Sequence, residues 1–335
     1  MELFVVSDKE FRKPPKCISL SCMLACKAAP GSKLFSSNLI SVVELDYCSI
    51  RDKRKWKNWR ISNRTTPTSS LLSSYFGHNT FVTYNKSIYT KMTEQPEDEE
   101  VEIVKVVNPP GSKPDHKANA LKHGTKHETH ARQHFMEWFR KNNYQNHKIT
   151  TISTGEMSVL NEITYDECKA HLISTPDLVL EVQDEPVIVE FKCPYFAILK
   201  KKDQTVPQVA LSFATENPFG TESSFIQAAT YALVHDAYYF YTAHYFTEGY
   251  DEESADNTMV IYKYRNSTEL MDTIFGAISA TETNLREFDP TKNPKFRSNT
   301  LRKRNISQLM KEHALMRAVY FTVSDTVCDI DVEGF

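Results

Sequence analysis

Three residues near the middle of the chain have types and spacing suited to phosphodiester hydrolysis. Asp177 stands just before the β-prone run 178–182, and Glu190 and Lys192 lie at the end of the next β-prone run, 186–192. The three residues between the two runs predict a hairpin. We therefore expect two acids and a lysine to meet on one pair of strands.

The hairpin geometry decides whether these side chains can act together. With a turn at Gln183 and Asp184, Asp177 stands opposite Glu190, and directly opposed side chains in an antiparallel pair are about 5 Å apart. Lys192 follows Glu190 by two positions, so the strand period of two places it on the same face. The other face then carries an apolar core surface of Leu178, Leu180, Val182, Val187 and Val189.

Two carboxylates held this close repel each other unless a cation lies between them. Carboxylate and carbonyl oxygens are the ligands that Mg²⁺ or Mn²⁺ prefers. Lys192 could then orient or deprotonate a water molecule whose pKa the metal lowers. The competing interpretation is an ordinary cross-strand salt bridge on a solvent-facing sheet, and the short D-x12-E-x-K pattern alone would favour it.

A third acid changes this balance. Residues 115–141 have helical periodicity, and Glu128 falls on the stripe formed by Leu121, Gly124, Ala131, Phe135 and Trp138. A carboxylate on the buried side of a helix needs a partner or a function. The sequence therefore predicts a helix acid that contributes to the same site.

Four motifs in order carry a family resemblance. They are 118–135 with its G-x-x-x-E-x-x-A pattern, Ser174-Thr-Pro-Asp177, Glu190-Phe-Lys-Cys-Pro194, and Gln227 in the predicted helix 222–235. Together they resemble the PD-(D/E)XK nucleases of the lambda exonuclease type, including the YqaJ viral recombinase nucleases and the viral alkaline exonucleases. The resemblance covers about residues 56–246.

The resemblance implies a role for each matching residue. Asp177 and Glu190 become the metal-binding carboxylates, Phe191 contributes its backbone carbonyl, and Lys192 is the lysine of the motif. Glu128 becomes the helix acid that helps to set the metal site, and Gln227 helps to position water or metal. The implied cofactor is Mg²⁺ or Mn²⁺, as two ions.

Family members also carry an earlier R-x4-5-T-x-S element that holds the 5′ phosphate of DNA. The segment 59–69 has the residue types without the regular spacing. By resemblance, the nucleic-acid-binding candidates are Arg60 or Arg64 with Thr65, Thr66, Thr68 or Ser69, and Thr175, which stands where the family often has a serine.

The order of elements predicts an α/β fold with a PD-(D/E)XK core, in which helices flank a mixed central β-sheet. We expect strands at 238–246 and 258–264 and helices at 270–286 and 306–317. Residues 1–45 are interpreted as a variable N-terminal extension and 46–335 as one lambda-exonuclease-like nuclease domain. An acidic and proline-rich connection lies near 94–114.

Composition and charge tell more about the location of the protein than about the reaction that it catalyses. The chain has 335 residues, of which 40% are hydrophobic, and its formal net charge of -3 gives no overall basic excess for nucleic acid. No apolar run is long enough to span a bilayer, and the seven cysteines form no C-x-x-C pair. We expect an intracellular protein, in the nucleus or cytoplasm, of a host cell if the source is a virus.

Other readings of the helix 115–141 and of the fold remain open. A zinc peptidase would need H-E-x-x-H, but Ala131 occupies the last position, so the histidines of this helix are expected on its surface, near DNA: His116, His123, His127, His130 and His134. A DNA-binding protein that keeps a nuclease-like fold with weak or no activity is the main alternative, and an endonuclease or RNase of the same superfamily is another.

The preferred function is a Mg²⁺-dependent deoxyribonuclease that degrades linear duplex DNA from 5′ to 3′ in recombination, repair or viral genome processing. By resemblance, it binds a 5′ phosphate end, forms a homo-oligomer and works with a single-strand annealing partner. No membrane partner is expected.

Overall fold

The computed structural model describes residues 40–79, 82–96, 116–143, 148–194, 204–247, 257–291, 300–321 and 327–328. Most of the predicted extension, 1–39, lies outside the described residues, as does 97–114 of the predicted acidic connection. Residues 40–45, which we assigned to the extension, belong to the first strand, β1 (Ile40–Ser49).

The described strands form two sheets. In the larger sheet the strand order is β10-β9-β8-β7-β6-β5-β2, and only β6 and β7 run parallel. Its strands are β2 (Ile149–Ser153), β5 (Leu178–Val182), β6 (Glu185–Lys192), β7 (Tyr239–Phe246), β8 (Thr258–Arg265), β9 (Ala314–Phe321) and β10 (Val327–Cys328). The smaller antiparallel sheet has the order β1-β3-β4, with β3 (Met157–Tyr165) and β4 (Cys168–Ser174).

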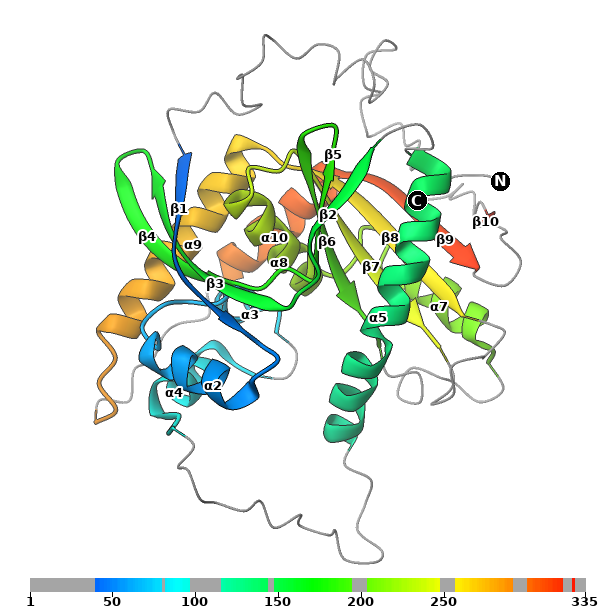
Figure 1. The fold of residues 1–335 in the computed structure, drawn as a ribbon. Coiled ribbons are helices and arrows are strands. Elements are labelled where there is room, and N and C mark those ends of the chain that lie inside the picture. Colours follow the sequence, from blue (N-terminus) through cyan, green and yellow to red (C-terminus); the bar gives the residue numbers. More distant parts are fainter. Residues whose placement is uncertain are drawn as a thin grey trace, which may run out of the picture.

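Helices cover both faces of the larger sheet (Figure 1). Helix α5 (His116–Asn143) packs on one face through Ala131, Phe135, Trp138 and Phe139. The other face is covered by α7 (Val206–Glu216), α8 (Glu222–Val234) and α10 (Thr300–His313). Helices α3 (Ser69–Tyr75) and α9 (Thr268–Arg286) pack on α8 and on β4 of the smaller sheet. A mixed central sheet flanked by helices confirms the predicted fold class.

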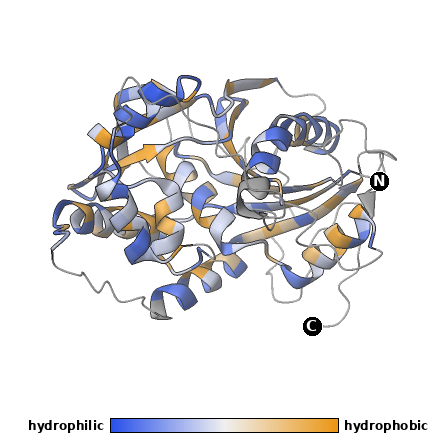
Figure 2. Cartoon of the chain, turned by 90° about the horizontal axis from the view of Figure 1, so that it is seen from below, coloured by the Kyte–Doolittle hydropathy of each residue, from blue (hydrophilic) through white to orange (hydrophobic). Residues whose placement is uncertain are grey.

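Two further helices, α2 (Lys53–Ser62) and α4 (Tyr84–Thr93), lie beside the smaller sheet and α3. Hydrophobic residues concentrate along the strands, whereas the outer turns of the helices are mostly hydrophilic (Figure 2). The molecule therefore has separate apolar layers on the two sides of β5 and β6.

One predicted helix was partly wrong. Residues 306–317 were expected to be helical, but α10 ends at His313 and Ala314–Phe321 form β9. Strand β9 pairs with β8 along its length and is almost entirely buried. Burial of β9 between β8 and β10 thus overrides the local helical pattern at the end of this segment.

Candidate active site

The β5–β6 hairpin has the predicted register. Leu178 pairs with Val189 and Val182 pairs with Glu185, and the turn residues Gln183 and Asp184 have φ of 53° and 65°. Positive φ at both central residues is the pattern of a two-residue type I′ turn, which matches the twist of the flanking strands. The turn therefore fixes Asp177, one residue before β5, opposite Glu190.

A hydrogen bond holds Asp177 in that position, because the backbone N–H of Phe191 donates to Asp177 Oδ2 at 2.8 Å. Gly155 (φ 75°) lies against the backbone of Pro176 and Asp177, and a Cβ at position 155 would lie 3.5 Å from Asp177 Cα. A side chain at 155 would have to adopt the left-handed conformation that favours glycine. The loop at Asp177 is thus held from two sides.

Glu190 is buried, with 2% of its surface exposed. Lys192 Nζ donates to Glu190 Oε1 and forms a salt bridge with it, while the lysine itself remains half-buried. The second oxygen, Glu190 Oε2, is buried and has no hydrogen-bond partner in the described part of the chain. An unsatisfied buried carboxylate oxygen is costly and points to a missing positive partner.

The two facing acids change each other's protonation. Burial raises the pKa of Asp177 and of Glu190, and the negative charge of Asp177 raises that of Glu190 further. Burial disfavours the charge of Lys192, yet Glu190 and Asp177 hold its pKa above the ordinary value. The site therefore contains a permanently charged lysine beside two acids that resist full ionisation.

Glu128 approaches this group from α5. Burial and the charge of Asp177 raise its pKa, and Arg132 Nη2 donates to Glu128 Oε1 at 3.1 Å. We expected Glu128 on the buried side of the helix. Its side chain is 37% exposed, however, so it lies at the edge of the apolar stripe. That position leaves the carboxylate free to face both solvent and Asp177.

The surface assignment of the α5 histidines was wrong for two of them. His123 and His127 are 3% and 2% exposed, with ring centroids 4.5 Å apart. Burial, together with the charges of His127 and Lys126, lowers the pKa of His123 to about 4. The two histidines lie one and two helical turns before Ala131, on its buried side of α5. The spacing of four residues between 123, 127 and 131 was consistent with this shared face. His130 and His134 are half-buried, and the side chain of His116 lies outside the described residues.

Helix α8 brings Gln227 and a residue that sequence analysis missed. Gln227 is half-buried. Tyr231, one helical turn later, is buried and shares a 2.6 Å hydrogen bond with Ser69 Oγ. Burial and the charges of Glu190 and Asp177 raise its pKa well above the ordinary value, so the phenol stays protonated beside the acids. The four-residue spacing from Gln227 was the only sequence signal for it.

His244 is a second missed neighbour. In the parallel register of β6 and β7 it lies beside Lys192, and it is 2% exposed. Burial and the charge of Lys192 lower the pKa of His244 to about 3, so the imidazole is neutral. No sequence motif marks it, since its place depends on the pairing of strands that are more than 45 residues apart in the chain.

The sequence of this region matches a known family. Residues 55–212 match the family described as the YqaJ-like viral recombinase domain. The crystal structure of an alkaline exonuclease (LHK-Exo) from Laribacter hongkongensis is similar over 69% of this chain and 92% of that one, with 13% identity and a TM-score of 0.40. No protein with a curated description matches the sequence. None of the described helices is long and apolar enough to cross a membrane.

The matched segment, 55–212, contains all the predicted site residues except Gln227, which follows its end. Its early segment reaches the site through hydrogen bonds. Trp56 Nε1 donates to Ser158 Oγ at 2.7 Å, and Ser158 Oγ lies 2.7 Å from Thr175 Oγ1. Ser69 joins from α3 through Tyr231. Thr175 and Ser69 are therefore brought to the neighbourhood of Asp177.

The other candidates of this segment are placed differently. Arg64 donates to the carbonyls of Ile61 and Met92, both at 3.1 Å, and so joins α2 to the end of α4. Thr65 is exposed and Thr66 is buried. Thr68 is the N-cap residue of α3, but its hydroxyl lies 3.2 Å from Ser70 Oγ and does not cap the helix. Arg60 lies over the Trp56 ring.

The donor set of this site fits a divalent cation. Glu190 Oε2 is an unsatisfied oxygen, and Asp177 faces it with a second carboxylate. Such hard oxygen ligands suit Mg²⁺ or Mn²⁺. No three His, Cys, Asp or Glu side chains among the residues described are grouped tightly enough to hold a metal ion. Glu128 is a further acid whose charge interacts with that of Asp177.

These raised pKa values predict a pH-dependent stability. A carboxyl whose folded pKa is raised stabilises the fold fully below its unfolded pKa of about 4, and this contribution is lost as the pH rises through the folded value. Without metal, the free energy of unfolding should therefore fall as the pH rises above about 4. Saturating Mg²⁺ should raise the melting temperature more at alkaline than at acidic pH, which thermal unfolding across a pH series measures. If Mg²⁺ raised the melting temperature equally at every pH, this prediction would be contradicted.

Proposed function

We propose that this chain is a metal-dependent deoxyribonuclease that hydrolyses phosphodiester bonds. The observation that carries the proposal is the pairing of Asp177 with Glu190 across the hairpin, with Lys192 bound to Glu190 and one glutamate oxygen unsatisfied. A buried pair of acids weakens a fold unless a cation neutralises it. The match to the YqaJ-like viral recombinase domain supports the same chemistry.

Each residue has a role in this proposal. Asp177 and Glu190, with the carbonyl of Phe191 and with Glu128, would hold Mg²⁺ or Mn²⁺, as two ions. When bound, the divalent cations polarise the scissile phosphate and lower the pKa of water. Lys192, fixed by Glu190, orients the attacking water and stabilises negative charge on the phosphate. Gln227 assists in positioning water from α8.

Tyr231 adds a hydrogen-bond donor. Because its pKa is raised, its hydroxyl keeps a proton that it can donate to a nearby oxygen. Its contact with Ser69 also fixes the start of α3 beside the acids. Tyr231 is thus a positioning residue that connects α3, α8 and the hairpin.

The proposed substrate is linear duplex DNA with a 5′ phosphate end, degraded from 5′ to 3′ during recombination, repair or viral genome processing. Ser69 and Thr175 support it, because two hydroxyl side chains lie close to the acids and could hold a phosphate. A homo-oligomer, a single-strand annealing partner and an intracellular location, in the nucleus or cytoplasm, belong to the same proposal.

Removal of metal tests the reaction. End-labelled linear duplex and circular duplex are incubated with the protein and Mg²⁺, Mn²⁺ or EDTA. We expect loss of the linear substrate only, with EDTA abolishing it and Mg²⁺ restoring it, and release of the 5′ label before the 3′ label. Cleavage that persists in EDTA, or that no divalent metal supports, would overturn the proposal.

A matched pair of variants isolates the site. Lys192→Ala should abolish cleavage, whereas Lys169→Ala should leave it unchanged. Lys169 also forms a salt bridge with a glutamate, Glu162, but on the exposed surface of β3 and β4. Equal activity of the two variants would remove Lys192 from the mechanism.

A further inference from the structure

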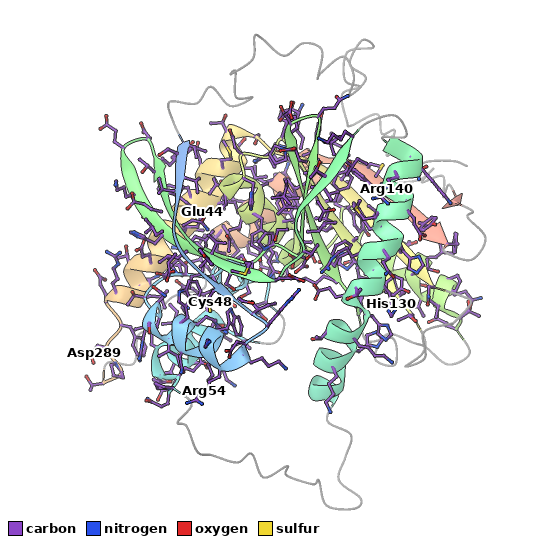
Figure 3. The ribbon with its side chains drawn as sticks, in the orientation of Figure 1. Glu44, Cys48, Arg54, His130, Arg140 and Asp289 are labelled. Carbon is purple, nitrogen blue, oxygen red and sulfur yellow. The ribbon has the colours of Figure 1, made fainter. Side chains whose placement is uncertain are left out.

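The start of α2 gathers positive charge on a chain that is slightly acidic overall. Residues 51–60 carry six arginines and lysines and one aspartate, a formal charge of +5 in ten residues, whereas the whole chain has a net charge of -3. The exposed cations of this segment form what we call the α2 cation surface: Arg51, Lys53, Arg54 and Lys55. Figure 3 shows Arg54 on the outer side of α2, away from the strands. These charges are therefore accessible to a partner from solvent.

The stability of the helix does not explain this arrangement. The positive end of the helix dipole disfavours cations in the first turn, and α2 has no acid there. Lys55 Nζ lies 3.6 Å from Asp52 Oδ2, and Arg51 Nη2 lies 2.5 Å from Glu156 Oε1. Both ion pairs are exposed, so they offset the charge only weakly. An anionic partner would therefore stabilise this turn.

Two tryptophans hold α2 beside the catalytic loop. Trp59 Nε1 donates to Asp46 Oδ2 of β1 at 2.6 Å. Trp56 Nε1 donates to Ser158 Oγ at 2.7 Å, and Ser158 Oγ lies 2.7 Å from Thr175 Oγ1, in the loop before β5. The α2 cation surface therefore keeps a fixed position relative to the paired acids.

The surroundings of these cations favour a double-stranded backbone over other polyanions. A lipid surface requires apolar residues beside the charges, but residues 51–55 are all charged and exposed. A single strand stacks its bases on open aromatic rings, but Trp56 and Trp59 are half-buried and hydrogen-bonded, and Arg60 covers the Trp56 ring. Duplex DNA presents about nine phosphate charges over about 15 Å of its axis, the length of ten helical residues.

We propose that the α2 cation surface is an interaction surface for duplex DNA, which contacts backbone phosphates of the duplex outside the catalytic centre. None of its residues belongs to the candidates for the 5′ phosphate, such as Arg60, Ser69 and Thr175. The surface adds affinity that depends neither on a DNA end nor on a metal ion. The inference rests on the proposed function, because it says where the substrate lies beyond the acids.

Binding without metal tests the surface independently of cleavage. A fluorescent duplex with 5′ hydroxyl ends is titrated with the protein in EDTA over a series of salt concentrations. The triple variant Lys53→Met, Arg54→Met, Lys55→Met should weaken binding about tenfold or more. The slope of log K against log salt should become shallower by about 2–3, since each lost phosphate contact removes about 0.9. Unchanged affinity and slope overturn the proposal.

The matched control removes three exposed cations from another helix. Lys303→Met, Arg304→Met and Lys311→Met on α10 change the net charge equally and should leave affinity and slope at the wild-type values. An equal loss in both triple variants would show a general effect of charge and would overturn the assignment to α2. Should the α2 triple variant not fold, Lys53→Gln and Arg54→Gln replace it singly. Each should make the slope shallower by about 0.9, and no change in either overturns the proposal.

Two further probes separate duplex DNA from other polyanions. A single strand of the same length and vesicles of anionic lipid are titrated with the wild type and with the α2 triple variant. We expect the variant to lose more affinity for the duplex than for the single strand, and we expect no binding of the vesicles. An equal loss on both nucleic acids, or vesicle binding that the α2 substitutions abolish, overturns the assignment to duplex DNA.

Failure of this inference is distinguishable from failure of the proposed function. If the wild-type chain cuts no DNA with any divalent metal but the α2 triple variant still binds duplex more weakly, the surface stands and the nuclease does not. If the wild type cuts and the α2 triple variant binds normally, the nuclease stands alone.

Discussion

Glu190→Gln is expected to reduce cleavage by about a thousandfold or more while the fold is retained. The amide keeps the shape of the side chain but removes the negative charge that a divalent cation and Lys192 require. It also relieves the repulsion from Asp177, so the metal-free variant should melt no lower than the wild type at alkaline pH. Cleavage of end-labelled duplex and thermal unfolding without metal measure the two effects.

The control is Glu181→Gln, the same chemical change on the same hairpin, where Glu181 pairs with Pro186 away from the acids. It should cleave at the wild-type rate. Normal cleavage by Glu190→Gln, or a melting temperature far below that of the wild type, would remove Glu190 from the centre of the site.

Phe135→Ala is expected to lower the free energy of unfolding by about 3–5 kcal/mol, the cost of deleting a large buried aromatic side chain. Phe135 is fully buried, and its ring centroid lies 5.5–5.7 Å from those of Phe139, Phe191, Tyr241 and Trp138. The substitution would open a cavity between α5 and the sheet, and the urea midpoint would report the loss.

Gln133→Ala is the matched control, since Gln133 is an exposed residue of the same helix. Its unfolding free energy should stay within about 0.5 kcal/mol of the wild type. A loss under about 1 kcal/mol in Phe135→Ala would show that α5 does not depend on this aromatic contact. Because α5 also carries Glu128, the Phe135 variant should lose cleavage at a lower temperature than the wild type.

Local sequence was sufficient for the hairpin and the fold class. Alternation fixed the two faces of β5 and β6, and in the structure the predicted apolar face packs against α5. The turn residues Gln183 and Asp184 then fixed the register, because a slip by one residue would move every side chain to the wrong face. The same register placed Asp177 opposite Glu190. The roles assigned to the site residues stay predictions for the experiments above.

Long-range contacts determined what the sequence could not. In the smaller sheet β1 pairs with β3, which lies more than 100 residues later in the chain, and no local sequence pattern predicts that pairing. His123 and His127 looked like surface residues because polar side chains carry no hydrophobic signal, yet the packing of α5 buries them. The strand β9 was read as helix because its partner β8 lies far from it in the chain.

Sequence by itself determined the mixed α/β class, the α5 helix and the hairpin that sets Asp177 and Glu190 face to face, because these depend on periodicity and turn geometry within short segments. Tertiary structure alone decided the neighbours: Tyr231 and His244 beside the acids. The physical reason is that desolvation and repulsion arise only when packing removes water from groups distant in the chain. A charge that looks ordinary in the sequence becomes unsatisfied only in the fold.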